Sequence, residues 1–440
     1  MINSQSVDEI IIAEWIVPVI PRNVVLEDHA LVVKNGVIHD LLQKEEALQK
    51  YSGQITDLKN HLLIPGLINT HTHAPMSLLK GYADDLPLME WLNNHIWPAE
   101  GKHICDEFIS DGADIAFAEM IKSGTTCIND MYFFPELVAK RAINCGMRAT
   151  VGLIVIDFPS AYANDADNYI AKGLDLHKEL QDCALVKTAF APHAPYTVSA
   201  KPLEKIVLLA DDLDLKIHMH LHETSDEVKQ FVKQHGQRPI SKMKELGVFS
   251  SRLNAVHMTQ LNNEEIDLVA DHKVNVIHCP ESNLKLASGF APAAELISAG
   301  VNLSLGTDGS ASNNDLDLLG EAKTAALIAK GRSLNAETVP AATALEMATI
   351  NGARTLGIDK ITGSLEIGKQ ADVVAINMSS INKKPVYNPV SQLIYCSNHD
   401  ITTVWINGRK LLDNRQLTTL DETELSDKAM YWQKRISSDF

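Results

Sequence analysis

The sequence has few cysteines, and they are widely separated. Six cysteines occur among 440 residues, and no two of them form a Cys-x-x-Cys pair. This spacing argues against a disulfide framework and against a zinc site built from thiolates. We therefore expect reduced cysteines that pack as small buried side chains, at positions 105, 127, 145, 183, 279 and 396.

Basic residues are also scarce. The 39 Lys and Arg residues are outnumbered by 56 Asp and Glu residues, which gives a formal net charge of −17. Proteins that bind nucleic acids neutralise phosphates with clustered cations, and no such cluster occurs here. We expect a small, uncharged or weakly charged substrate and no nucleic-acid partner.

Long apolar runs are missing as well. No stretch reaches the roughly 18 apolar residues of a membrane helix, and the first ten residues lack the basic start and apolar run of a signal peptide. We therefore expect a cytoplasmic protein without a membrane partner. The composition, 45% hydrophobic and 22% charged, is that of a globular protein with a large core.

The two ends of the chain share a β-rich texture. Residues 30–38 contain an Asn-Gly pair that is typical of a hairpin turn, and similar apolar runs return at 371–376 and 403–411. We predict that residues 1–66 and 366–440 together form one small β-sandwich domain. The last segment, 422–440, is predicted to be a polar helix on the surface or against a partner subunit.

Between these ends, short apolar runs alternate with helical segments, a pattern typical of βα units and a parallel sheet. The fold class is therefore α/β. The eight runs predict a closed (β/α)8 barrel, similar to a TIM barrel, over residues 67–365. They lie at 67–70, 126–128, 148–153, 186–191, 216–220, 253–256, 274–277 and 301–305.

The strongest local signal is the stretch 65–73 (PGLINTHTH), in which an apolar strand ends in His71 and His73. Because side chains alternate along a strand, the two imidazoles project from the same side. In a parallel barrel, that end of the strand is where active sites are built. Imidazole pairs bind zinc, iron and nickel, whereas the alternative is a surface loop that contains two histidines.

Two further strand ends carry similar chemistry. Residues 217–223 (IHMHLHE) place His218, His220 and His222 on one face, and periodicity does not decide which of them binds a metal. Asp308 follows the run 301–305, although an Asp-Gly pair there is also typical of a turn or a helix cap. Together the three ends would supply imidazole and carboxylate ligands and leave one position open for water, as catalytic metal sites do.

Seven stretches spread over most of the chain carry a resemblance to a known family: PGLINTHTH (65–73), ADDLPLMEW (83–91), HIWPAE (95–100), APHAPY (191–196), HLHE (220–223), HCPESNLK (278–285) and GTDGSASNN (306–314). They resemble the amidohydrolase superfamily, and within it the 5′-methylthioadenosine/S-adenosylhomocysteine deaminases. The resemblance implies hydrolytic removal of the 6-amino group from an adenosine-type nucleoside, giving the inosine analogue and ammonia. The substrate would be 5′-methylthioadenosine, S-adenosylhomocysteine or adenosine.

The resemblance also implies a role for individual residues. The metal ligands would be His71, His73, His220 and Asp308, holding one Zn²⁺ per subunit, with iron or manganese as alternatives. The catalytic residues would be Glu223 as proton carrier, His257 beside the hydrolytic water, and Asp308. The substrate would contact Glu100 through its ribose hydroxyls, Glu223 through the ring nitrogen N1, and His193. His218 and His222 would support the ligands or pack, and His278 would be structural.

Other interpretations stay open on the sequence. A guanine, cytosine or triazine aminohydrolase, or a chlorohydrolase, would use similar metal chemistry in a different pocket. A non-catalytic assembly protein would be expected to lack the ligands, and a two-metal site would need a strand lysine, for which Lys187 is the only candidate. Arg148 is a candidate for binding a homocysteine tail. The apolar wall of the pocket is predicted from Met89, Trp91, Trp97, Met131, Tyr132, Phe133 and Phe134, which could equally be core residues. We also expect a homo-oligomer, either a dimer or a tetramer.

Overall fold

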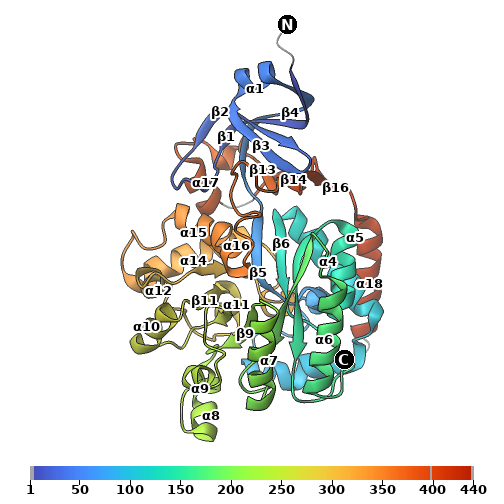
Figure 1. Ribbon diagram of the computed structural model, residues 1–440, viewed down its shortest axis with the longest axis vertical. Coiled ribbons are helices and arrows are strands. Elements are labelled where there is room, and N and C mark those ends of the chain that lie inside the picture. Colours follow the sequence, from blue (N-terminus) through green and yellow to red (C-terminus); the bar gives the residue numbers. More distant parts are fainter. Residues whose placement is uncertain (1–3, 397–398, 438–440) are drawn as a thin grey trace.

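A computed structural model describes residues 4–396 and 399–437. The described chain contains two eight-stranded sheets, one parallel and one mixed. Figure 1 shows the mixed sheet at one end of the elongated molecule and the helix-covered parallel sheet below it. Residues 438–440, which belong to the predicted C-terminal helix, lie outside the described residues.

The parallel sheet contains the eight strands predicted from the apolar runs. Every residue of these strands is buried except Lys187, because one face points into the barrel and helices cover the other. The strands are adjacent in chain order: β5 (Leu67–Thr72), β6 (Thr125–Asp130), β7 (Arg148–Val155), β8 (Val186–Pro192), β9 (Ile217–Leu221), β10 (Leu253–His257), β11 (Asn275–His278) and β12 (Leu303–Leu305).

The first and last strands approach each other and complete the barrel. The Thr70 hydroxyl donates to the Leu305 carbonyl at 2.7 Å, and the Asp308 amide donates to the His71 carbonyl at 3.0 Å. These bonds confirm the predicted (β/α)8 class. They also bring Asp308 beside the His-x-His pair, although 236 positions separate Asp308 from Thr72, its partner in a parallel bridge.

Helices surround the barrel and line its open end. Their apolar faces join the strands in one large buried cluster. They are η1 (Ala74–Leu79), α2 (Leu88–Trp91), the π-helix η2 (Leu92–Ile96), α3 (Trp97–His103), α4 (Asp106–Lys122), α5 (Pro135–Cys145), α6 (Ala166–Glu179), α7 (Ala200–Asp212), α8 (Ser225–His235), α9 (Pro239–Glu245), α10 (Asn263–Asp271), α11 (Pro280–Lys285), α12 (Ala293–Ser298), α13 (Ser310–Asn313), α14 (Leu318–Ser333), α15 (Ala341–Met347) and α16 (Ile350–Leu356).

The second sheet joins both ends of the chain, as predicted. Its order is β16-β15-β14-β13-β4-β1-β2-β3, with β1 and β4 parallel and the other pairs antiparallel. The elements are β1 (Gln5–Ile16), β2 (Leu26–Lys34), β3 (Val37–Gln43), α1 (Lys44–Lys50), β4 (Tyr51–Pro65), β13 (Val373–Asn377), η3 (Ile381–Lys383), β14 (Ile401–Ile406), β15 (Arg409–Asp413) and β16 (Gln416–Leu417).

This sheet curls around a small core of its own. Two strands separate β14 from β1, yet the Trp405 indole nitrogen donates to the Glu9 carboxylate at 2.9 Å. Leu31 and Ile38 share a buried apolar cluster with Trp405. The two halves of the sheet therefore face each other across that cluster.

The last two helices contact helices of the barrel. Helix α18 (Glu422–Ser437) lies along α4 (Figure 1), and buried Trp432 contacts Phe108 with a ring separation of 5.2 Å. Helix α17 (Pro389–Tyr395) contacts α14 and α15. The division at residues 66 and 366 stays a prediction. Within the described residues, no helix combines the length and the apolar composition that a membrane span requires.

Candidate metal centre and active site

Polar side chains gather at the C-terminal ends of the barrel strands. His71 lies near the end of β5 with His73 just beyond it, His220 lies near the end of β9, and Asp308 follows β12. These strand ends meet at one mouth of a parallel barrel. The alternation of side chains thus delivers groups from distant parts of the chain to one place.

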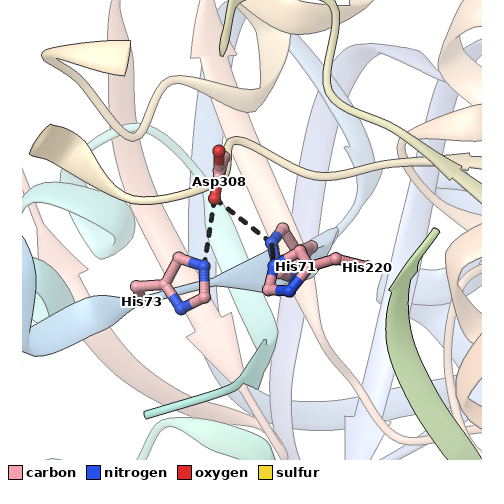
Figure 2. Close-up of side chains that lie close together, drawn as sticks. All are labelled: His71, His73, His220 and Asp308. Atoms are coloured by element: carbon pink, nitrogen blue, oxygen red, sulfur yellow. Dashed lines mark hydrogen bonds and ion pairs between the residues drawn. The ribbon is translucent and has the colours of Figure 1, made fainter. Parts of the chain in front are cut away.

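Four of these side chains form a compact cluster, drawn in Figure 2: His71, His73, His220 and Asp308. Asp308 Oδ1 lies 3.2 Å from the Nε2 atoms of both His71 and His73. His71 Nε2 is also 3.2 Å from His220 Nε2. One donor atom from each of the four residues lies within 4.8 Å of the others.

Neighbouring groups fix the orientation of the imidazole rings. His73 Nδ1 donates to the Met131 carbonyl at 2.5 Å, and His220 Nδ1 donates to the His193 carbonyl at 2.9 Å. Since each Nδ1 carries the proton, each neutral ring turns the lone pair of Nε2 toward the cluster. Metal-binding histidines are commonly held in this way.

Hydrogen bonds also fix the orientation of the Asp308 carboxylate. Its Oδ2 accepts hydrogen bonds from the Ser282 hydroxyl at 2.6 Å and the Ser312 hydroxyl at 2.8 Å, which leaves Oδ1 facing the histidines. The backbone of Asp308 has a φ of +62°, a left-handed conformation that is uncommon outside glycine and is typical of functional sites.

The charges of the cluster favour a bound cation. Burial lowers the pKa of His71 to about 4. Burial also lowers the pKa of His73, but the adjacent Asp308 carboxylate outweighs it and raises this pKa to about 9. Asp308 therefore requires a positive partner, which is a proton on His73 in the metal-free protein. Three imidazoles and a carboxylate fit zinc, and also iron or manganese.

Glu223 and His257 lie beside the cluster. Burial raises the pKa of the Glu223 carboxyl, whose Oε2 lies 3.8 Å from His257 Nε2 and whose Oε1 accepts from the Ser288 hydroxyl at 3.3 Å. His257 Nδ1 donates to Asn283 Oδ1 at 2.9 Å, which directs Nε2 toward Glu223. Glu223 is thus suited to exchange protons with a molecule in the mouth of the barrel.

A cavity of about 250 Å³ opens in front of these groups. Glu100 from α3 lies in its wall, accepts a hydrogen bond from the Tyr132 hydroxyl at 2.6 Å, and has a pKa that burial raises to about 7. The His193 side chain also lines the cavity, and burial lowers its pKa to about 3. The predicted site residues therefore gather at one place: His73, Glu100, His193, His220, Glu223, His257 and Asp308 line the cavity, and His71 lies behind them in the cluster.

Several groups that support this site were not predicted from the sequence. They are Ser282, Asn283, Ser288 and Ser312, and the carbonyl groups of Met131 and His193, whereas Tyr132 was predicted only as part of the apolar wall. Ser282 and Asn283 fall inside the quoted stretch 278–285 and Ser312 inside 306–314, which were the available signals. A carbonyl group leaves no trace in a sequence.

The structure also places the residues that were left ambiguous. His218 contacts His71, whereas His222 faces away and contacts the Gln260 carbonyl at 3.3 Å. His278 is buried outside the cluster. Of the seven apolar candidates, five line the cavity and two, Met89 and Phe134, do not.

Two candidate cations lie away from the cavity. Lys187 is the exposed residue of β8, so it does not reach the barrel mouth. Arg148 begins β7 at the opposite end of the barrel, where its guanidinium pairs with Asp372 at 2.8 Å and is buried. The hypothesis that Arg148 binds a homocysteine tail is therefore wrong.

The sequence was compared with models of known protein families. The amidohydrolase family profile matches residues 62–411. The chain belongs to the amidohydrolase family. This membership confirms the family resemblance and agrees with the barrel and its His-x-His strand end.

Similar proteins cover most or all of the chain. A 5-methylthioadenosine/S-adenosylhomocysteine deaminase of Saccharophagus degradans is 46% identical over 440 residues, which is 100% of this chain and 99% of that protein. A 5′-deoxyadenosine deaminase of Methanothermobacter thermautotrophicus is 42% identical over 381 residues, or 85% and 87% of the two chains. The crystal structure of an adenosine deaminase from Xanthomonas campestris with bound zinc has a TM-score of 0.98 and 48% identity, covering 99% of this chain and 100% of the other.

Proposed function

We propose that the protein is a zinc-dependent hydrolase that removes the 6-amino group of an adenosine-type nucleoside. The observation that carries the proposal is the position of Glu223, a buried carboxyl in the same cavity wall as the four-residue cluster. The names of the similar proteins, all deaminases of adenosine derivatives, support it.

His71, His73, His220 and Asp308 would hold the zinc ion. When bound, zinc lowers the pKa of a coordinated water to about 7, which makes a nucleophile available at neutral pH. The outer contacts of the ligands, from His218, two carbonyl groups and two serines, keep their donor atoms in place. Because these contacts already order the ligand side chains, less free energy is lost in ordering them when the ion binds.

Glu223 would move the protons. Its raised pKa lets it hold a proton in the cavity, donate it to adenine N1 while the oxygen of water bonds to C6, and regain one from that water. It then passes this proton to the amino nitrogen, the C6–N bond breaks and ammonia leaves, and the proton of the C6 hydroxyl returns to Glu223 as the C6=O bond forms. His257 Nε2 faces Glu223 and would stabilise the tetrahedral carbon.

Glu100 would bind the ribose. Tyr132 donates to Glu100 Oε1, and that bond orients the carboxylate toward the cavity it lines. Carboxylates accept hydrogen bonds from hydroxyl groups, so this side chain is suited to a ribose. The names of the similar proteins favour a nucleoside over the alternative substrates of the same scaffold.

The activity is tested directly. Zinc-loaded protein is incubated with 5′-methylthioadenosine, 5′-deoxyadenosine, adenosine, guanine and cytosine, and ammonia release and conversion to the inosine analogue are followed. We expect turnover of the nucleosides and about one zinc per chain by elemental analysis. Turnover of guanine or cytosine alone would contradict the proposal.

We further propose a cytoplasmic homo-oligomer. Six free cysteines, three of them buried, suit a reducing compartment. Fractionation of the source cells and light scattering on the purified protein test location and subunit number. A monomer in solution would contradict the dimer or tetramer.

A further inference from the structure

The cavity that would receive the substrate has an uneven distribution of charge. Of the described residues that line it, none is a lysine or an arginine. Its acidic groups are Glu100, Glu223 and Asp308. Much of the remaining wall is apolar and includes Leu88, Leu92, Phe133, Ile154, Ile156 and Phe158.

From this wall we infer that the enzyme selects nucleosides whose 5′ substituent is uncharged, such as methylthio or methyl, over those with an amino-acid tail. The inference rests on the proposed function. A nucleoside with C6 at the cluster and its ribose at Glu100 has its 5′ substituent in the same cavity. S-adenosylhomocysteine would bring a carboxylate into that space.

Lysines beside the lining segments lie outside the cavity. Lys285, next to Leu286, pairs with Asp84 at 2.6 Å. Lys172 donates to the Tyr162 carbonyl at 2.6 Å and lies 4.6 Å from the ring of that residue. Lys102, next to Gly101, is exposed and does not line the cavity. With Arg148 at the far end of β7, the described chain offers the tail no cation inside the cavity.

The apolar wall has a physical consequence for each type of substituent. A methylthio group gains from contact with the aliphatic and aromatic side chains. The homocysteine tail carries a carboxylate and an ammonium group; both lose hydration there, and the carboxylate gains no cationic partner. We expect kcat/KM for S-adenosylhomocysteine to be about 100-fold below that of an uncharged nucleoside of equal length.

Three substrates separate charge from size. 5′-methylthioadenosine, 5′-butylthioadenosine and S-adenosylhomocysteine are compared by kcat/KM with the zinc-loaded, full-length enzyme. We expect the butyl compound to be converted well above S-adenosylhomocysteine, since its three extra methylene groups gain from contact with an apolar wall. Equal values for S-adenosylhomocysteine and the butyl compound would overturn the inference, whereas failure to convert either thioether would contradict the proposed function instead.

A variant pair tests the wall itself. Phe158 lines the cavity and is 46% exposed, so a polar side chain fits there. Phe158→Arg should raise the ratio of kcat/KM for S-adenosylhomocysteine to that for 5′-butylthioadenosine by about tenfold. Phe158→Gln, which removes the ring without adding charge, should leave the ratio within about threefold of wild type. Equal ratios in the two variants would show that charge does not set the preference, and would overturn the inference.

Discussion

His71 Nδ1 lies 2.8 Å from His218 Nε2, so one buried histidine orients another. His218 Nδ1 in turn lies 2.9 Å from the Asn129 side-chain amide nitrogen. The Nδ1 atoms of the other two histidines, His73 and His220, donate to backbone carbonyl groups instead. His71 is thus the one histidine of the four-residue cluster whose orientation depends on a side chain that can be substituted.

Replacement of His218 should therefore weaken metal binding. We expect His218→Ala to lower the affinity for zinc about 10- to 100-fold, because His71 loses the partner that fixes its ring. Competition with a chromogenic chelator measures the affinity independently of turnover. His177→Ala is the control, since His177 contacts Thr188 on another part of the barrel. Equal affinities for the two variants would contradict this role of His218.

Glu223→Gln should abolish most of the activity and leave zinc in place. Glutamine keeps the size and one acceptor of the side chain but carries no proton to exchange, so we expect kcat to fall about 10²- to 10⁴-fold. Elemental analysis and steady-state kinetics are measured on the same sample. Glu204→Gln, an exposed change on α7, should match wild type. If Glu223→Gln retained wild-type kcat, another group would have to carry the proton.

Glu100 should make the metal-free protein less stable as pH rises. Its pKa is about 7 in the folded state against an ordinary value of 4.5, so the folded protein binds more protons between these values. The free energy of unfolding therefore falls as pH rises from about 4.5 to about 7. Glu100→Gln removes this contribution. The free energy of unfolding of the variant, relative to that of wild type, should therefore be about 1–3 kcal/mol higher at pH 8 than at pH 4.5.

Urea unfolding of both proteins at the two pH values measures that difference, with Glu204→Gln as the exposed control. The Tyr132 hydrogen bond can persist in the variant, because glutamine keeps a carbonyl acceptor. A difference between Glu100→Gln and wild type that does not change with pH would show that Glu100 titrates normally.

Removal of the metal should lower the thermal stability of the whole chain. A ligand at about 1,000 times its dissociation constant stabilises the folded state by about 4 kcal/mol. For a protein of this size we expect the melting temperature to fall by about 5 °C or more after chelation and to recover when zinc is added. Calorimetry of the treated and reloaded samples gives the shift. In the Asp308→Ala variant, added zinc should raise the melting temperature only slightly, since the carboxylate of the cluster is gone.

Much of the fold could be predicted from local patterns. The eight apolar runs became strands because each is short, apolar and bounded by polar turns, and such runs are buried wherever they pair. The His-x-His pair at the end of β5 points to one side because side chains alternate along a strand, whatever the strand contacts. The acidic composition and the scattered cysteines likewise needed no coordinates to interpret.

Other features arise only when distant segments meet. Periodicity left His218, His220 and His222 equivalent, and they separate because β9 lies opposite β5, which sets His220 against His71 Nε2 and His218 against His71 Nδ1. For Arg148, the sequence indicated the right strand, but the residue lies at the wrong end of that strand. It begins an eight-residue strand that rises about 3.3 Å per residue, so its side chain lies roughly 25 Å from the mouth despite belonging to the right strand.

The kinds of donor atoms available to a metal, and the strands that carry them, follow from local sequence, because apolar runs mark the strands and side chains alternate along each strand. The contact between His71 and His218, 147 positions apart, the serine on Asp308, 26 positions apart, and the tyrosine on Glu100, 32 positions apart, follow from packing between separate segments. Such contacts depend on how the barrel closes, and no short stretch of sequence contains that information.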